Sequence, residues 1–395
     1  MADTTISQLN TISTLSANNF IPISDGTTTT KLGTESLFGF RNRIINGDMR
    51  IDQRNNGAAV TITNINYPWT YSVDRWSVFN YQPSKLSVQR NMDSIAPPSG
   101  FTNYVGIKTV SPYSIGVNES FGIHQRIEGN NCYDLGWGTN NAKTITLSFW
   151  VRSSKTGIFA GYLDNYFDNR WFTFTYNIIS ANTWEYKTIT IPGDVTGNWR
   201  TDNLAGVLVG FYVGAGTGFS SSINTWGSNQ SYPIGGANIL DTLNAAFYIT
   251  GVQFELGSTA TPFERRFIGT ELALCQRYYN RITRTANDAS LTQSFFDAAF
   301  WTGPVANDGY CHSTYRFPVL MSSESITADF SNASTFWYHI GGVAQGVITA
   351  VGGNVLGVDA FKFGLRMSYN GGNGFSGQIL ARNGYTAYLG FSAEL

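Results

Sequence analysis

The sequence predicts an all-β protein whose main part is a jelly-roll or β-sandwich module. Over residues 145–151, Ile, Leu, Phe and Val alternate with Thr, Ser and Trp, which is the period-two pattern of a half-buried strand. The 395 residues include 42 glycines and 11 prolines, which suits many short strands joined by tight turns. No pattern of helical period and useful length occurs across residues 41–267. A sandwich is therefore the predicted architecture of that span.

The chain is predicted to divide into four segments, because 395 residues exceed what one hydrophobic core usually serves. Residues 1–40 form an N-terminal attachment segment, residues 41–267 the jelly-roll module, and residues 268–279 a connecting helix. Residues 280–395 return to strand patterns punctuated by glycine pairs, which predicts a smaller C-terminal β domain. Residues 204–213 are apolar almost throughout, which favours a strand covered on both faces.

The N-terminal segment is rich in Thr, Ser and Asn and is too small to hold a core alone. Its scattered apolar residues are nevertheless too many for a solvated tail, so we expect another protein to cover them. The residues predicted to make this attachment are Leu9, Leu15, Phe20 and Ile21. The alternative is a disordered tail.

The helix over 268–279 is predicted to be capped by Thr270, with Glu271 in the first turn where the helix dipole favours a negative charge. It is apolar on much of its circumference, which is more than one sandwich edge needs to cover. We therefore expect it to meet its symmetry mates near a threefold axis, or else to pack as a connector against its own domain. The predicted interface residues are Leu272, Leu274, Cys275, Tyr278 and Tyr279.

Two charged motifs are predicted to have structural roles. The motif 74–76, Asp-Arg-Trp, suggests an ion pair under an indole ring. The motif 264–266, Glu-Arg-Arg, is expected to pair with Asp48, Asp52 or Glu255.

Composition excludes several classes of function. Charged residues make up 13% of the chain and the net charge is −1, whereas a nucleic-acid binder needs a basic stripe to neutralise phosphates. The three cysteines stand far apart with no C-x-x-C, so neither a disulfide framework nor a zinc site is expected. The start of the chain lacks the pattern of a secretory signal, and no apolar run reaches membrane-spanning length. We expect synthesis in a reducing cytoplasm.

No catalytic constellation is predicted. The three histidines, His124, His312 and His339, fall in no metalloprotease or serine-hydrolase motif. His312 follows Cys311 directly, but neighbours along a strand point to opposite faces and cannot share a proton. Asp164 and Asp168 are the nearest candidates for a glycosidase pair. The prediction is a protein that is not an enzyme.

Sugar binding needs flat apolar faces for one side of the ring and neutral amides or carboxylates for the hydroxyl groups. Residues 162–171 supply both within one hairpin-like stretch, and several tryptophans lie on the polar side of strands or in loops. The predicted sugar-binding residues are Trp150, Asp164, Asn165, Tyr166, Asp168, Trp171, Trp199 and Trp226. The alternative for each tryptophan is a core lid or a subunit contact.

No cofactor is predicted, apart from the option of a structural calcium ion. Hard oxygen ligands gather at Asp164, Asn165, Asp168 and Asn169, although their spacing matches no EF-hand loop. The alternative is a solvated turn rich in Asp and Asn.

Five stretches, in this order and spacing, resemble a recurring module of tailed-bacteriophage structural proteins, in particular tail fibres and receptor-binding proteins. They are NRIINGDMRIDQR (42–54), YSVDRWSV (71–78), TITLSFWVRS (144–153), IPGDVTGNWRTDN (191–203) and ITGVQFELGSTATPFERRFIGTELALCQRYY (249–279). The module itself is similar to the jelly-roll carbohydrate-binding domains of glycan-degrading enzymes. The resemblance covers roughly residues 41–279.

The resemblance implies a homotrimeric virion protein on the phage tail or particle surface. Residues 1–40 would be a virion-attachment segment that joins it to other virion proteins, and residues 280–395 would form the distal tip. Its role would be non-catalytic adhesion to host cell-surface polysaccharide. One alternative is a head-decorating or tail-scaffold protein that binds only virion proteins. The other is a tailspike that depolymerises polysaccharide.

Overall fold

The structure is a computed structural model. Its backbone is described over residues 20–24, 29–33, 41–65, 69–165, 167–219, 222–285, 299–304, 310–322, 326–332, 336–340, 344–347, 350–352, 362–368, 376–381 and 386–395. Side chains are described over 41–65, 69–165, 167–219, 222–283, 316–322, 326–327, 329–332 and 387–395. The predicted attachment residues Leu9 and Leu15 lie outside the described residues, as do the side chains of Phe20 and Ile21.

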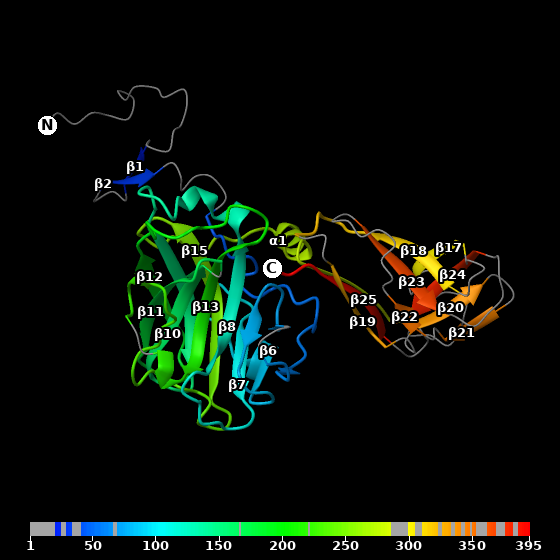
Figure 1. Cartoon of the computed structure of the whole chain (residues 1–395), viewed down its shortest axis with the longest axis horizontal. Coiled ribbons are helices and arrows are strands. Elements are labelled where there is room, and N and C mark those ends of the chain that lie inside the picture. Colours follow the sequence, from blue (N-terminus) through cyan, green and yellow to red (C-terminus); the bar gives the residue numbers. More distant parts are fainter. Residues whose placement is uncertain are drawn as a thin grey trace.

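Two antiparallel sheets form a β-sandwich, which confirms the predicted all-β fold (Figure 1). The seven-stranded sheet runs in spatial order β14 (Trp226–Gly227), β11 (Arg170–Ile178), β10 (Gly157–Asn165), β13 (Ala205–Ala215), β8 (Ser120–Glu128), β5 (Ser77–Phe79) and β4 (Thr70–Tyr71). The six-stranded sheet runs β12 (Glu185–Ile191), β9 (Ile145–Ser153), β15 (Ala246–Leu256), β7 (Val105–Thr109), β6 (Leu86–Arg90) and β3 (Val60–Thr61).

The core lies between the two sheets and follows from the alternation of side chains along each strand. On β9, Leu147 and Phe149 are fully buried, and the Phe149 ring packs edge-on against Phe211 of β13 with ring centres 4.9 Å apart. The outward side chains Leu208 and Tyr212 of β13 are buried as well. The prediction that this strand is covered on both faces is therefore confirmed, and its outer cover forms part of the site described below.

Helix α1 (Ile268–Gln276) begins where the sequence predicts it and ends three residues early, because the chain continues from Tyr279 as a strand. The residue at its N-cap is Phe267, and no side chain caps it, so the predicted role of Thr270 is wrong. Single turns of 3-10 helix occur at η3 (Met92–Ser94), η4 (Gly129–Asn131), η5 (Tyr133–Leu135) and η6 (Thr217–Phe219).

The predicted subunit interface on α1 needs correction for three of its five residues. Cys275, Tyr278 and Tyr279 are at most 1% exposed within a single chain. Cys275 and Tyr278 pack against Ile45 and Ile51 from the start of the module, with Leu272 and Leu274 half-buried beside them. The face of the helix that carries Cys275 is therefore covered by distant parts of its own chain, as expected for a connector, whereas Ile268 in the first turn is 56% exposed.

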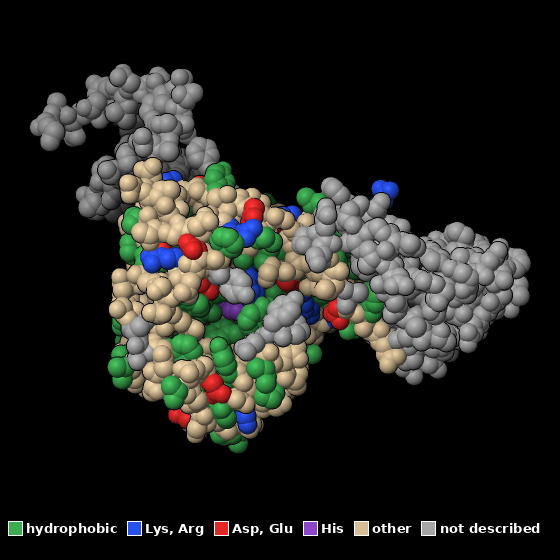
Figure 2. Space-filling model, viewed as in Figure 1, with side chains coloured by type: hydrophobic (Ala, Val, Ile, Leu, Met, Phe, Trp, Pro, Cys, Tyr) green, Lys and Arg blue, Asp and Glu red, His purple; other side chains and the backbone are tan. Residues whose placement is uncertain are grey.

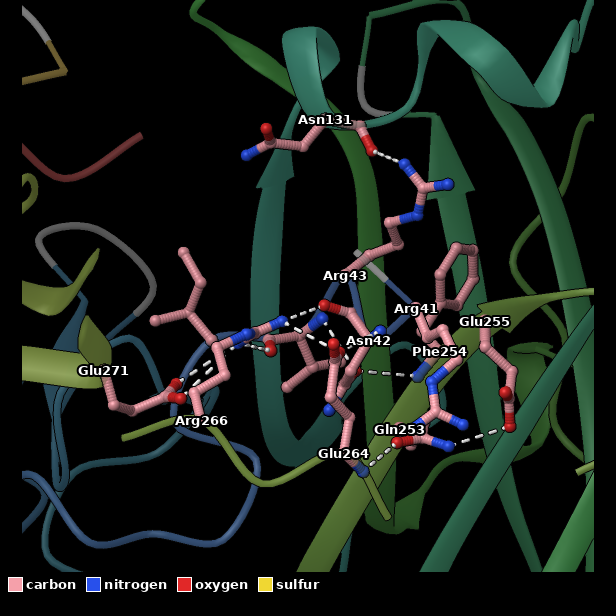
Figure 3. Close-up of polar contacts among 12 residues, drawn as sticks. Arg41, Asn42, Arg43, Asn131, Gln253, Phe254, Glu255, Glu264, Arg266 and Glu271 are labelled. Carbon is pink, nitrogen blue, oxygen red and sulfur yellow. Dashed lines mark hydrogen bonds and ion pairs between the residues drawn. The ribbon is translucent and has the colours of Figure 1, made fainter. Parts of the chain in front are cut away.

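A polar network ties the start of the module to the segment before α1 (Figure 3). The Arg266 guanidinium donates to the carbonyl oxygens of Asn42 and Ile44, and it pairs with Glu264 at 3.6 Å and Glu271 at 3.4 Å. The Asn42 side-chain oxygen accepts hydrogen bonds from the backbone of Ile44 and Phe254. The predicted pairing of 264–266 with Asp48, Asp52 or Glu255 is replaced by this network.

Arg75 also pairs differently from the prediction. Its guanidinium forms an ion pair with Glu394, near the end of the sequence, and stacks over the Tyr278 ring at 3.4 Å. The neighbouring Asp74 instead accepts hydrogen bonds from Gln53. The partner of Arg75 therefore comes from a segment more than three hundred positions away, which local sequence cannot reveal.

The remaining strands form three small antiparallel sheets and a hairpin (Figure 1). The first sheet consists of β16 (Tyr279–Thr285), β25 (Thr386–Ser392) and β19 (Thr327–Phe330). The second consists of β17 (Ala299–Pro304), β24 (Ser376–Ala381), β20 (Phe336–Ile340) and β21 (Ala344–Val347). The third consists of β18 (Tyr310–Arg316), β23 (Lys362–Ser368) and β22 (Ala350–Gly352). The hairpin is β1 (Phe20–Ser24) with β2 (Thr29–Gly33). In the picture, β25 runs back from these strands to α1. Among the described residues, no helix has the length and apolar character to cross a membrane.

Candidate functional site

The outer face of the seven-stranded sheet carries a cluster of aromatic and polar side chains, which we call the hollow. Figure 2 shows this face hollowed between hydrophobic side chains, with a histidine visible inside; His124 is the one histidine whose side chain is described. The residues of the hollow are Trp69, Phe79, His124, Arg126, Tyr162, Asp164, Trp171, Leu208, Tyr212 and Tyr232. Trp69 and Trp171 are half-buried at its rim, and most of the others are nearly fully buried.

The strand register places these side chains in two rows. His124 of β8 lies opposite Gly210 of β13, which in turn lies opposite Tyr162 of β10. In the next row Arg126, Leu208, Asp164 and Trp171 follow one another across four strands. Residues that are directly opposite in an antiparallel sheet share a face. Four segments far apart in the sequence therefore contribute to one surface.

Glycine at the centre of the first row makes room for an aromatic ring. A Cβ atom on Gly210 would lie 2.3 Å from the Tyr162 ring, which is closer than real contacts allow. The Tyr162 ring therefore lies over the backbone of β13, where a side chain would otherwise stand. On β8 the same applies to Gly122, where a Cβ would lie 2.4 Å from the Phe79 ring. The floor of the hollow is thus made of flat rings on bare backbone.

The rings pack against one another across the floor. The Tyr162 ring centre is 4.8 Å from that of Tyr212 and 5.2 Å from that of Trp171. The His124 ring stacks on Phe79 at 5.4 Å and meets Trp69 edge-on at 5.0 Å. Such mutual packing fixes the orientation of each ring. A ligand would therefore meet a preformed surface.

Two polar atoms in the hollow lack hydrogen-bond partners among the described residues. These atoms are His124 Nε2 and Asp164 Oδ1, both buried. The other nitrogen of His124, Nδ1, lies 3.3 Å from the Tyr162 hydroxyl. Leaving a buried polar atom unpaired typically costs about 1–3 kcal/mol. Each of the two atoms can take a hydrogen bond from water or from a polar ligand that enters the hollow.

Burial also changes the charge of these two residues. Burial, reinforced by the Arg126 charge, lowers the pKa of His124 well below its usual value, so the imidazole is neutral at pH 7. Burial raises the pKa of Asp164 to about 7, although the Arg126 charge opposes the rise. The hollow therefore presents a neutral imidazole beside a carboxyl group that is about half protonated at neutral pH.

The structure separates the predicted sugar-binding residues instead of bringing them together. Asp164 and Trp171 lie in the hollow, whereas Trp150 lies on the outer face of the six-stranded sheet beside Tyr186. Asn165 donates to the Asn198 carbonyl oxygen at 3.1 Å, and Asp168 accepts the Asn198 backbone N–H at 2.5 Å. Tyr166 lies outside the described residues.

Trp199 and Trp226 pack with Trp137 into a three-tryptophan cluster at the edge of the core. Their ring centres are 4.8–5.4 Å apart. The indole N–H groups of Trp199 and Trp226 donate to the carbonyl oxygens of Thr196 and Pro192. The rings of Trp199 and Trp226 therefore pack on other rings of the protein, and their N–H groups bond to its backbone. This arrangement corresponds to the alternative in which each tryptophan is a lid on the core.

The side chains predicted as calcium ligands do not converge. Asp164 and Asn165 are successive residues of β10 and point to opposite faces. The oxygens of Asn165, Asp168 and Asn169 already accept hydrogen bonds from protein N–H groups. Within the described part of the chain, no group of three His, Cys, Asp or Glu residues is placed to hold a metal ion. Asp164 therefore cannot join the other three residues in one calcium site.

Sequence reasoning missed most of the hollow. Phe79, His124, Arg126 and Tyr212 were absent from the predicted site, and His124 was considered only against catalytic motifs. The available indication was local: Tyr212 and Tyr162 occupy outward positions of their strands, and Gly210 and Gly122 occupy outward positions nearby. Which strands are neighbours cannot be obtained from such local patterns.

No family model matches the sequence, and no curated protein matches it. Among solved structures, the chain is similar to the enzymatically active domain of tailspike protein 4 of bacteriophage CBA120 (13% identity, 55% of this chain, 21% of that chain, TM-score 0.30). It is also similar to a protein described as CBM4 (14% identity, 54% of this chain, 98% of that chain, TM-score 0.27). A third is the family 11 carbohydrate-binding module of Clostridium thermocellum (11% identity, 51% of this chain, 97% of that chain, TM-score 0.25).

The chain spans about a fifth of the length of that tailspike chain. Because these TM-scores are 0.30 or lower, the comparisons carry no argument about the fold. The evidence for the sandwich is the strand pairing and the core of this protein itself.

Proposed function

We propose that this protein binds neutral glycans through the hollow and uses that binding for non-catalytic adhesion. The main observation is the combination of an aromatic floor with two unpartnered buried polar atoms, Asp164 Oδ1 and His124 Nε2, in the described structure. The C–H face of a sugar ring would pack on Trp69 and Trp171, the half-buried rings at the rim. Its hydroxyl groups would complete the hydrogen bonding of the two polar atoms.

A sugar hydroxyl fits these atoms better than a charged group does. A hydroxyl can donate to the Asp164 carboxylate, and it can either donate to or accept from a neutral imidazole. An anionic ligand would meet the partly ionised Asp164, and a cationic ligand would meet the adjacent Arg126. Because the hollow holds one acidic side chain, Asp164, beside one basic side chain, Arg126, it favours an uncharged ligand.

We further propose that the protein is a homotrimeric component of a tailed-bacteriophage virion, with residues 1–40 binding other virion proteins. The support is the resemblance of the five sequence stretches to tail-fibre and receptor-binding proteins. Three linked sites raise the effective concentration of each for a shared polysaccharide, so weak individual binding becomes strong adhesion. The host surface polysaccharide would be the receptor.

The test is binding of purified protein to immobilised neutral and acidic host polysaccharides. We expect retention on neutral polysaccharide, with Trp171→Ala weakening the affinity about tenfold, which corresponds to about 1.4 kcal/mol. Tyr133→Ala is the matched control, because Tyr133 is 67% exposed and lies outside the hollow. Retention that is unchanged in Trp171→Ala, or retention on acidic polysaccharide alone, would contradict the proposal.

One observation favours a second candidate, a polysaccharide depolymerase. A carboxyl group with a pKa near 7 is typical of the general acid in a glycosidase, and the pKa of Asp164 is raised to about 7. A glycosidase needs a second carboxylate, and Asp164 is the one carboxylate among the described residues of the hollow. Release of reducing ends from host polysaccharide, lost in Asp164→Asn, would establish this function in place of adhesion.

A further inference from the structure

A second concave surface lies on the opposite sheet of the sandwich, and we call it the groove. It follows the outward side chains of β12, β9 and β15. In register across the first two strands, Tyr186 lies opposite Trp150, Thr188 opposite Ser148, and Thr190 opposite Thr146. The rows are therefore aromatic at one end and hydroxyl-bearing at the other.

The groove has two adjoining parts that share Tyr186 and Pro262 in their walls. The aromatic part has a volume of about 320 Å³ and is lined by Trp150, Phe101 and Phe263 among others. The hydroxyl part has a volume of about 590 Å³, and every residue that lines it is Ser, Thr or Tyr apart from Ala260 and Pro262. Volumes of this size are usual for small-molecule sites.

The aromatic part is held in a fixed shape. The Trp150 and Tyr186 rings lie 5.3 Å apart at an angle of 46°, and Tyr186 is 45% exposed. The strand β15 has a bulge between Thr250 and Gln253, with Gly251 at a φ of 62°. A Cβ on Gly251 would lie 2.6 Å from the Phe101 ring, so the glycine allows that ring to approach the floor.

Some polar atoms of the groove are used within the protein, and others face outward. The hydroxyl groups of Thr146, Thr190 and Thr261 donate to the Gly257 and Ser258 carbonyl oxygens and to the Glu255 carboxylate. Tyr186 and Thr188 are exposed on β12 and can meet a ligand. Arg265 is the one charged residue in the described lining, and it donates to the Gly100 carbonyl oxygen and stacks on Phe101 and Phe263. The lining thus offers ring faces and hydroxyl groups, with Arg265 as its one cationic side chain among the described residues.

We propose that the groove is a second glycan-binding site, which takes a neutral oligosaccharide on the side of the sandwich away from the hollow. The proposal extends the function proposed for the hollow and rests on it for the class of ligand. Adjacent aromatic and hydroxyl parts suit a ligand that alternates C–H faces with hydroxyl edges. The hydroxyl part, lined mainly by Ser and Thr, disfavours a protein partner there, because these residues are under-represented among those that dominate protein interfaces.

Two glycan sites on opposite sheets would allow one chain to cross-link a polysaccharide. Each chain could hold two separate polysaccharide strands at once, whatever its oligomeric state. The protein would then cross-link a polysaccharide, whereas a single-sided monomer could only coat it.

The experiment uses the full chain labelled with 5-fluorotryptophan, with the signals of Trp150 and Trp171 assigned by Trp→Phe variants. The probes are neutral hexasaccharides of β-1,4-linked glucose, xylose and galactose, followed by ¹⁹F NMR. We expect at least one probe to shift the Trp150 signal. We also expect Tyr186→Ala to weaken that titration about tenfold while leaving the Trp171 titration unchanged. Tyr133→Ala, at an exposed tyrosine outside the groove, is the control and should change neither.

The outcomes separate the two sites. A shift at Trp171 without any shift at Trp150 would overturn the groove and leave the hollow intact. A shift at Trp150 alone would support the groove and contradict the hollow. If no probe shifts Trp150, and Tyr186→Ala lowers the mass measured by sedimentation, the groove is a subunit contact and the proposal is wrong. A lack of any shift with unchanged mass would also overturn it.

Discussion

Replacing Asp164 by Asn should stabilise the protein at alkaline pH and leave its stability nearly unchanged in acid. Asp164 faces the outer side of the seven-stranded sheet, with His124 and Arg126 on β8 and Tyr162 and Tyr212 nearby as the other titratable groups. Burial raises its pKa from 3.8 to about 7, so the ionised carboxylate is disfavoured in the folded state. An amide of the same shape cannot ionise and avoids that cost.

The sign and size follow from the two pKa values. Below pH 3.8 the carboxyl group is protonated in both the folded and unfolded states, and it costs nothing. Between 3.8 and about 7 the folded state binds more protons, so the free energy of unfolding falls as the pH rises. Each pKa unit corresponds to about 1.4 kcal/mol, so the full penalty above pH 7 is about 4 kcal/mol.

The assay is urea unfolding of the wild type and Asp164→Asn at pH 4 and pH 8, followed by tryptophan fluorescence. We expect the variant to gain up to about 4 kcal/mol at pH 8 and less than about 1 kcal/mol at pH 4. The control is Asp202→Asn, because the hydrogen bond and charge of Arg200 lower the pKa of that exposed carboxyl group, and no gain is expected there. A gain that is equal at both pH values, or a loss at pH 8, would refute the reasoning.

Three further substitutions test the packing around the site and the core. Glu394→Ala should cost about 3–5 kcal/mol and lower the midpoint of thermal unfolding by on the order of 10 °C, because it leaves Arg75, at 2% exposure, without its ion-pair partner. An unchanged midpoint would show that the pair contributes little. Gly210→Ala should cost about 1–3 kcal/mol in urea unfolding and weaken glycan binding, because its Cβ would displace the Tyr162 ring. A gain in stability would contradict the close contact. Trp137→Ala should cost about 3–5 kcal/mol in thermal unfolding, since it opens a cavity in the three-tryptophan cluster; a loss under 1 kcal/mol would count against a core role.

The sequence was sufficient to predict strands and their faces, because alternation is a local property. Trp150 and Trp171 were both placed on the outward side of their strands, and both occupy outward positions. Their two strands belong to different sheets, however, so the residues lie on opposite sides of the protein. Sheet membership depends on pairing between distant segments, which one sequence does not reveal.

The same limit explains the errors around α1. The apolar surface of the helix suggested a contact with other subunits, because it is larger than one sandwich edge needs to cover. Ile45 and Ile51, more than two hundred positions earlier, provide that cover, together with Leu395 near the end of the sequence. Arg75 likewise finds its partner in Glu394. Local patterns predict that a surface is apolar or charged, but long-range contacts decide what covers it.

The positions of the hollow and the groove constrain how adhesion can work. They lie on the outer faces of two stacked sheets, so they face away from each other and cannot both rest on one flat surface. A protein that uses both sites must therefore be surrounded by its ligand, as it would be inside a thick polysaccharide layer. Purified protein should then precipitate a long neutral polysaccharide, and Tyr186→Ala should abolish precipitation if the protein is a monomer. In a trimer either site alone would be present three times, so precipitation would persist in Tyr186→Ala and in Trp171→Ala and would end only in the double variant.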